Sequence, residues 1–170
     1  MTIAILAVPI ATLAWQFRVQ EGERAVVAAL ERDQVFMVAH WERSDAWYWF
    51  PRRLRRVKFT SIPREPSHSY IPGLKRLAVR HVAILSRLPA LRELDISHCG
   101  DIEPAALRAL PSLRTVETLD LSFTKVGNDA IEHLAGMRGL KELHIQQAEI
   151  DDDGLAELRR LRPDIAVWDD

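Results

Sequence analysis

Three side chains, Asp95, Asp120 and His144, have the types and spacing that could do chemistry in this sequence. Each stands between two apolar residues of a short segment, so all three are expected at one position of neighbouring strands. Two carboxylates and an imidazole at that spacing could bind a divalent cation or share a proton. Solvated aspartates on an open surface are the favoured alternative, because a carboxylate there needs no partner besides water.

Two further candidates, His81 and His98, are expected side by side on the same surface. Two imidazoles without a third ligand make a poor zinc site, so solvated histidines are favoured over a pH-sensitive contact. Cys99 is the single cysteine and is expected in a turn, buried as an inert small side chain. We therefore predict no cofactor and no metal.

The elements that position these residues repeat along the second half of the chain. Apolar residues recur at a step of about 24 residues, within the range of leucine-rich repeats. The recurring sets are Ile102, Val126, Ile150; Leu107, Ile131, Leu155; Leu110, Leu134, Leu158; and Leu113, Met137, Leu161. A unit this small cannot bury its own apolar face, so the units must stack into a solenoid.

The pattern L-x-x-L-x-L predicts where each strand of the solenoid begins. It is matched from Leu54, Leu74, Leu91, Val116 and Leu140, and Ile165 with Val167 predicts a last strand. A turn and a short outer helix should follow each strand. The fold class is therefore α/β, with a parallel concave sheet and short helices on the convex side.

Side chains between the leucines of each strand should face the concave surface. That surface is predicted to be basic at its N-terminal end, acidic in the middle and neutral at its C-terminal end, which would orient a partner of reverse pattern. Phe123 is the best single anchor, as a large apolar ring on a polar sheet. The predicted binding residues are Arg76, Arg80, His81, Glu93, Asp95, His98, Asp120, Phe123, Glu142 and His144.

Residues 3–17 carry no charge and are almost wholly apolar. The run is shorter than the about 20 residues of a bilayer span, yet it favours an anchor or export signal over a buried helix of a soluble domain. We therefore expect a membrane-associated, single-pass protein. Arg18, Arg24 and Arg32 would keep the repeats in the cytoplasm by the positive-inside rule, and export with the repeats outside stays open.

Between this run and the repeats, the sequence predicts an amphipathic helix over 21–33, a short strand over 35–39 and an aromatic cluster over 47–51. These elements should cap the open N-terminal end of the stack. The predicted organisation is an anchor- or signal-like helix over 1–18, an N-terminal cap over 19–53, and repeats with a C-terminal cap strand over 54–170.

The segment Val-Glu-Thr-Leu-Asp-Leu-Ser-Phe-Thr-Lys-Val-Gly-Asn-Asp-Ala-Ile-Glu-His-Leu (116–134) and its copy over 140–158 resemble the repeat of bacterial leucine-rich-repeat proteins. The copy with Cys99 resembles the cysteine-containing variety. The N-terminal half is similar to one group of these proteins, in which an apolar segment ending in Trp precedes a helix like that over 23–31. The resemblance implies a membrane anchor and supports the solenoid.

The near-neutral net charge of -1 removes the simplest argument for nucleic acid as a partner, despite a dense basic stretch over 52–58. The main prediction is a non-catalytic, membrane-tethered scaffold that binds a protein through its concave face. One alternative is a structural envelope component that associates with copies of itself. The other is an enzyme or metal site at Asp95, Asp120 and His144. The partner's identity and the oligomeric state stay open.

Overall fold

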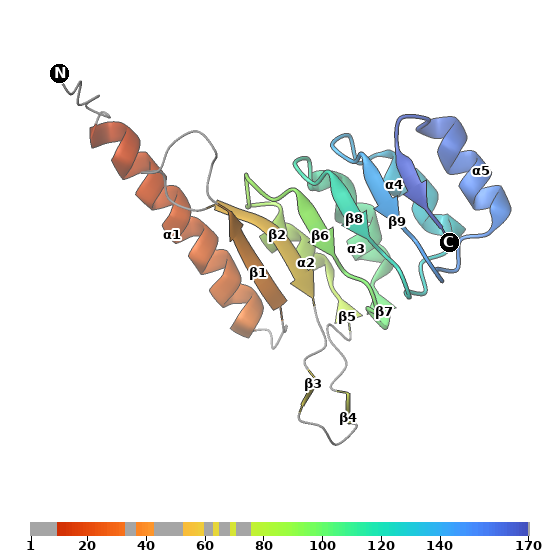
Figure 1. Ribbon diagram of the computed structural model, residues 1–170, viewed down its shortest axis with the longest axis horizontal. Helices are drawn as coiled ribbons and strands as arrows, with labels where there is room; N and C mark the ends of the chain where they lie inside the picture. The colour runs from red at the N-terminus through yellow and green to blue at the C-terminus, as the bar shows by residue number, and fades with distance from the viewer. Residues whose placement is uncertain are drawn as a thin grey trace, which may run out of the picture.

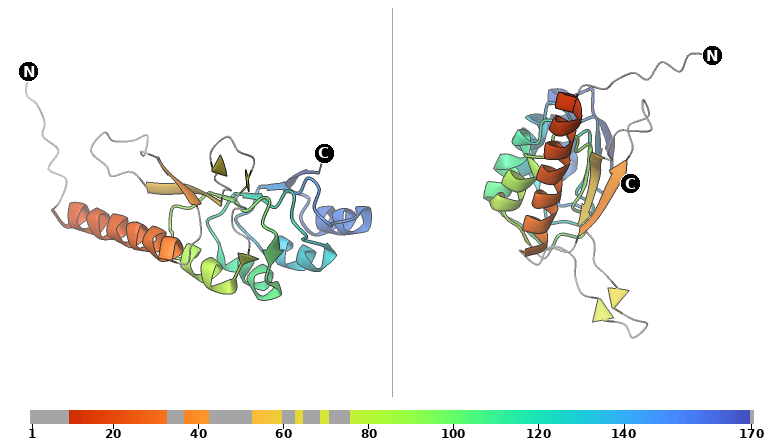
Figure 2. Two further views of the ribbon diagram at one scale, coloured as in Figure 1. Left: turned by 90° about the horizontal axis from the view of Figure 1, so that it is seen from below. Right: turned by 90° about the vertical axis from the view of Figure 1, so that its left-hand side faces the viewer.

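The computed structural model describes residues 10–32, 37–42, 53–59, 63–64, 69–70 and 76–169 of the 170-residue chain. A six-stranded sheet runs through it in the order β1-β2-β6-β8-β9-β10. Helices line one face of the sheet and leave the other face open (Figures 1 and 2). The strands are β1 (Met37–Glu42), β2 (Arg53–Phe59), β6 (Glu93–Asp95), β8 (Thr118–Asp120), β9 (Glu142–His144) and β10 (Ala166–Trp168).

The helical layer is made of short elements that follow the strands in sequence. The elements are α2 (Val79–Leu85), α3 (Pro104–Ala109), η1 (Leu110–Ser112), η2 (Asn128–Ala130), α4 (Ile131–Ala135) and α5 (Asp152–Leu161). Because each unit runs strand, turn and helix, every return to the sheet makes a parallel pair. β2, β6, β8, β9 and β10 pair in parallel, and β1 alone pairs antiparallel with β2.

The core between the sheet and the helices consists of the recurring apolar residues. Leu94, Leu119 and Leu143 stand in register on β6, β8 and β9 and are all buried. The helical positions Leu110, Leu134 and Leu158 are fully buried beneath them. Leu161 is the exception at 38% exposed, because no described helix packs against the outer side of α5.

The first unit differs from the prediction made for residues 74–79. Instead of a strand of the main sheet, β5 (Arg76–Leu77) pairs with β7 (Asp101–Ile102) in a separate two-stranded sheet, and α2 begins at Val79. Leu77 stands opposite Ile102, which identifies β5 as the segment that follows the strand and turn of a unit. The strand of that unit is β2, and the hairpin of β3 (Pro63–Arg64) and β4 (Ser69–Tyr70) lies between β2 and β5.

At the N-terminus a single helix, α1 (Ile10–Arg32), spans the end of the apolar run and most of the predicted amphipathic helix. The charged residues from Arg18 onward therefore belong to the same helix as the apolar ones. None of the helices in the described part of the chain has the length and apolar character needed to cross a bilayer. The prediction of a single-pass membrane protein is contradicted by this finding.

α1 is joined to the sheet through its second half. Val26 and Leu30 are buried in the common core. Glu23 is also buried, and its carboxylate accepts a hydrogen bond from the Leu54 N–H of β2 at 3.1 Å. The predicted short strand is present as β1, which begins at Met37, and the aromatic cluster over 47–51 lies outside the described residues.

Candidate functional site

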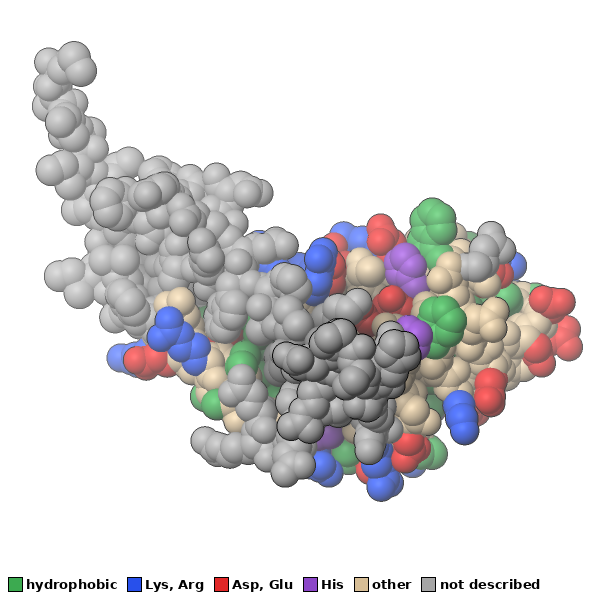
Figure 3. All heavy atoms as spheres, turned by 60° about the horizontal axis from the view of Figure 1, so that its bottom comes forward, with side chains coloured by type: hydrophobic (Ala, Val, Ile, Leu, Met, Phe, Trp, Pro, Cys, Tyr) green, Lys and Arg blue, Asp and Glu red, His purple; other side chains and the backbone are tan. Residues whose placement is uncertain are grey.

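The open face of the sheet carries two rows of side chains at right angles to the strands. Strand pairing places Glu93, Thr118 and Glu142 in one row, as the predicted alternation required. The second row contains Asp95, Asp120, His144 and Trp168. Figure 3 shows acidic, histidine and hydrophobic side chains gathered beside one another on this side of the molecule.

The two aspartates of the second row form part of the turns that follow their strands. Asp95 Oδ1 accepts hydrogen bonds from the Ser97 N–H at 3.0 Å and the Ser97 hydroxyl at 2.6 Å. Asp120 Oδ1 accepts from the Ser122 N–H at 2.8 Å. An aspartate that binds the N–H two residues further on forms an Asx turn. Each aspartate thus places a negative charge on the sheet face, while one of its carboxylate oxygens holds the backbone of the following turn.

Three residues in these turns share an uncommon backbone conformation. His98, Phe123 and Gln147 have φ values of 58, 59 and 55°, in the left-handed region. Since all three turns adopt it, the conformation belongs to the repeat itself. It turns the rings of His98 and Phe123 outward, where they stack with centroids 4.4 Å apart and planes 4° from parallel. Phe123 is 48% exposed.

A second pair of rings lies at the C-terminal end of the sheet. The His144 and Trp168 rings stack with centroids 6.1 Å apart and planes 11° from parallel, and Trp168 is 57% exposed. Trp168 is a candidate residue that the sequence reasoning missed. The alternation of Ile165 and Val167 toward the core already placed Ala166 and Trp168 on the opposite side, so the signal was present.

The structure brings seven of the ten predicted residues together and separates the other three. Glu93, Asp95, Asp120, Glu142 and His144 lie on the open sheet face, and His98 and Phe123 lie in the adjoining turns. Arg76, Arg80 and His81 do not belong to this face, because their segment forms β5 and α2. The Arg56–Glu93 ion pair joins β2 to β6, and the Arg92–Glu117 pair joins the residues just before β6 and β8; of these four residues only Glu93 was predicted as a site residue.

The three displaced residues have other surroundings. Arg76 pairs with Asp101 at 3.3 Å and with Glu103 at 3.1 Å, and so links β5 to the next unit. Arg80 is exposed on α2. His81 was expected to be a surface histidine beside His98, but it is buried in α2, where its Nδ1 accepts a hydrogen bond from the Ala78 N–H at 3.2 Å.

The alternative of a metal or catalytic site finds little support here. Within the described residues, no group of three or more His, Cys, Asp or Glu side chains is placed to hold a metal ion, the set Asp95, Asp120 and His144 included. Cys99 is buried as expected, and its thiol lies 3.3 Å from the Asp101 carbonyl oxygen. Burial raises the pKa of this thiol, which disfavours the nucleophilic thiolate.

A parallel sheet with leucines at fixed positions of each strand and helices on one side defines an α/β repeat architecture. Residues 88–110, 112–135 and 138–158 match the family model described as Leucine Rich repeat. The segment 88–158 therefore consists of leucine-rich repeats. No curated protein matches the chain. Leucine-rich repeats generally serve as scaffolds that bind proteins and are typically not catalytic.

Proposed function

We propose that this protein is a non-catalytic scaffold that binds a partner protein through one continuous surface. We call this surface the binding face, and define it by Glu93, Asp95, His98, Asp120, Phe123, Glu142, His144 and Trp168. The observation that carries the proposal is the presence of two stacked ring pairs, His98–Phe123 and His144–Trp168, each with an exposed hydrophobic ring, beside four carboxylates of the sheet face.

The aromatic groups supply the apolar part of the contact. Large rings that a partner can cover give much of the binding free energy of protein interfaces. Because Phe123 and Trp168 are each stacked on a histidine, their rings are already partly ordered. Little side-chain entropy is then lost when a partner covers them.

The acids determine which partner fits. Asp95 and Asp120 are neighbours in the second row, on adjacent strands about 4.8 Å apart, and Glu142 lies in the first row on the next strand. Carboxylates at this spacing attract a partner segment that carries several cationic groups. The expected partner is therefore a protein surface in which lysine or arginine side chains flank an apolar patch.

The same proposal assigns a capping role to the N-terminal elements. Val26 and Leu30 of α1 are buried in the core, and Glu23 binds the backbone of β2. A solenoid needs its first unit covered, since the first unit has no preceding neighbour. α1 and β1 would thus close the stack of repeats at the end away from Trp168.

Affinity capture from the protein's native cells tests the binding face. The full chain is compared with the double variant Phe123→Ala/Trp168→Ala and with a control, Val79→Ala, which shortens an exposed apolar side chain of α2. Loss of two aromatic anchors should weaken capture of a specific partner by at least tenfold, and the control should retain it. Equal recovery by all three proteins would contradict the proposal.

A charge-reversed variant, Asp120→Lys/Glu142→Lys, tests the predicted chemistry of the partner. If the partner is cationic there, the variant should lose affinity most strongly at low salt, because salt screens exposed charges. If the main captured protein is a second copy of this chain, the binding face mediates self-association and does not bind a different protein. Stronger capture by the variant would show that the partner is acidic instead.

A further inference from the structure

A second surface lies at the N-terminal ends of the parallel strands, away from the turns that carry His98 and Phe123. A groove of about 360 Å³ crosses three consecutive units there. Its charged lining consists of Arg92, Arg114, Glu117, Arg138, Lys141 and Asp164. Cations outnumber acids in this groove, whereas acids predominate on the binding face.

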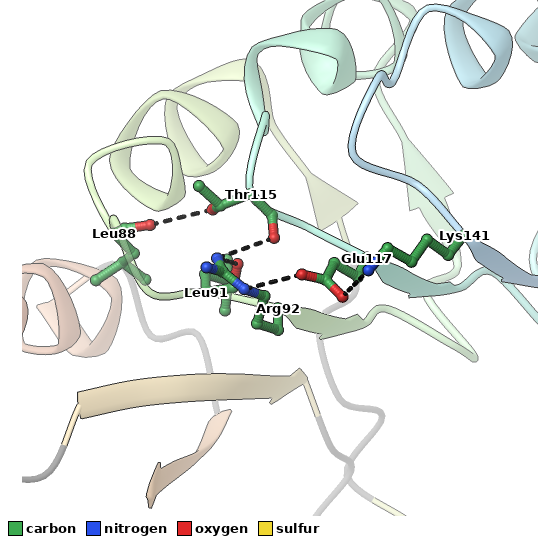
Figure 4. Close-up of polar contacts among 6 residues, drawn as sticks. All are labelled: Leu88, Leu91, Arg92, Thr115, Glu117 and Lys141. Atoms are coloured by element: carbon green, nitrogen blue, oxygen red, sulfur yellow. Dashed lines mark hydrogen bonds and ion pairs between the residues drawn. The ribbon is translucent and has the colours of Figure 1, made fainter. Parts of the chain in front are cut away.

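The carboxylate of Glu117 lies between Arg92 and Lys141, and each of its two oxygens has a cationic partner (Figure 4). One of its oxygens lies 3.0 Å from Arg92 Nε, and the other lies 2.7 Å from Lys141 Nζ. The hydrogen bond from Lys141 lowers the pKa of Glu117, so the group stays ionised. Arg92 is held further by the carbonyl oxygens of Leu91 and Thr115, to which it donates.

The second carboxylate, Asp164, is also already paired. Both of its oxygens accept hydrogen bonds from Arg162 at 2.8 Å. Neither acid of the groove is therefore available to neutralise another cation. Any further positive charge in the groove must be balanced by solvent or by a ligand.

Arg114 and Arg138 are the cations that remain. They are exposed, and their side chains form no ion pair with the described residues. They hold equivalent positions one unit apart. Gly139 keeps the two loops close, because a Cβ at this position would collide with the carbonyl oxygens of Arg114 and Val116. The groove thus presents two exposed arginine side chains one unit apart.

We infer that this groove, which we call the basic groove, binds an acidic peptide segment of a partner protein. A guanidinium group binds a carboxylate through two parallel hydrogen bonds, so Arg114 and Arg138 match two acidic side chains of an extended chain. The fixed carboxylates of Glu117 and Asp164 would repel a polyanion of high charge density such as a nucleic acid. A peptide with separated carboxylates avoids that repulsion.

The probe is a fluorescein-labelled peptide in which glutamate alternates with serine, titrated with the full chain at low salt and followed by fluorescence anisotropy. The variant Arg114→Gln/Arg138→Gln should bind about tenfold more weakly than the wild type, since two exposed charge pairs are lost. The matched control, Arg87→Gln/Arg108→Gln, removes the same charge from the turn after α2 and from α3, and should bind as the wild type does. The variant Arg114→Lys/Arg138→Lys keeps the positive charge but lacks the paired N–H donors of a guanidinium group, so its loss of peptide affinity should be intermediate.

Equal weakening by the two glutamine variants would overturn the inference, because the effect would then reflect net charge alone. The inference is also overturned if the wild-type protein does not bind the peptide. The same holds if single-stranded RNA or vesicles of anionic lipid displace the peptide and bind the same two arginines with higher affinity. Phe123→Ala should leave peptide binding unchanged. A failure of the basic groove is therefore separable from a failure of the binding face.

Discussion

Polar side chains act differently at the two ends of the strands. On the entry side, defined by the loops over 88–92, 113–117, 137–141 and 161–165, arginines bind backbone carbonyls and carboxylates of the neighbouring unit. On the exit side, defined by the turns over 97–99, 122–124 and 146–148, Asp95 and Asp120 bind backbone N–H groups of the turns that follow them, and the first two turns carry the stacked rings of His98 and Phe123. Backbone hydrogen bonds link the units on the exit side too, from the His98 N–H to the Ser122 carbonyl and from the Phe123 N–H to the Gln146 carbonyl. The difference therefore lies in the side chains: those of the entry side join the units, and those of the exit side are displayed.

This difference has a physical origin in the repeat. Entry loops leave carbonyl groups near the ends of the short helices, and these need donors when they are partly buried. In the exit turns, Asp95 and Asp120 accept from N–H groups of their own turns, and the Thr124 hydroxyl donates to the Leu121 carbonyl at 2.6 Å. The N–H groups of His98 and Phe123 donate to backbone carbonyls of the next unit, so no outward side chain is needed for these bonds. The outward positions of the exit turns can therefore vary without loss of a hydrogen bond. Substitutions on the two sides should separate stability from binding.

Arg162→Ala should give the largest loss of stability. Arg162 donates to the carbonyl oxygens of Ala135, Met137 and Leu140 at 3.0–3.1 Å, so its removal leaves three acceptors of the preceding unit without this donor. We expect a decrease of about 3 kcal/mol in the free energy of unfolding. Urea denaturation measures this loss. The control is Arg160→Ala, two residues earlier in α5, which is expected to lose less than about 0.5 kcal/mol.

A loss below about 1 kcal/mol for Arg162→Ala would show that water replaces the guanidinium group at those carbonyls. The entry side would then be no more important for stability than the exit side. The comparison between the two sides would fail at its strongest point.

Gly139→Ala should cause the second-largest loss of stability. A Cβ at this position would lie 2.9 Å from the Val116 carbonyl oxygen and closer still to that of Arg114, and both are backbone atoms that cannot turn away. Forcing two entry loops apart should reduce the free energy of unfolding by about 2 kcal/mol. At the control position, Gly136, the nearest atom to an added Cβ is Pro111 Cγ at 3.2 Å. Gly136→Ala should therefore shift the thermal midpoint less than Gly139→Ala does, and equal shifts would refute the argument.

Asp120 allows the structural and binding contributions of the exit side to be measured separately. Asp120→Ala removes the acceptor for the Ser122 N–H and should lower the free energy of unfolding by about 1 kcal/mol. Asp120→Asn retains an oxygen at that position, so its stability should match the wild type while the charge of the binding face is reduced. Urea denaturation of both variants tests this, and equal losses would show that charge, and not turn geometry, matters at Asp120.

Much of the repeat architecture was predictable because buried leucines recur at a fixed step. The parallel register of Glu93, Thr118 and Glu142 follows from that step alone, and the structure confirms it. His98 and Phe123 were predicted on the concave face itself, whereas the structure places them in the turns that follow β6 and β8. The register was predictable because these repeat units have nearly the same length, so aligning one pair of units fixes the alignment of the others.

The prediction for the first unit was wrong because the length of this unit differs from that of the other units. Leu74, Leu77 and Val79 fit the strand pattern, but the spacing of Val79, Val82 and Leu85 equally fits a helix. The insertion between β2 and β5 hides the true step, so Arg76, Arg80 and His81 were assigned to the wrong surface. The basic groove was missed for another reason: Arg114 and Arg138 lie in loops, where no periodic burial indicates which way a side chain points.

Phe123→Asn should give the smallest change in stability and the clearest test of what the exit side is for. Asparagine adopts the left-handed conformation more readily than phenylalanine, a gain of roughly 0.5–1 kcal/mol, and loss of the stack on His98 removes a similar amount. The two terms should cancel, so urea denaturation should give the wild-type free energy of unfolding within about 0.5 kcal/mol. Phe123→Ala lacks the conformational gain and should be the less stable of the two variants. A loss above about 1 kcal/mol for Phe123→Asn would mean that the ring supports the fold, and its exposure could then no longer be read as a sign of partner binding.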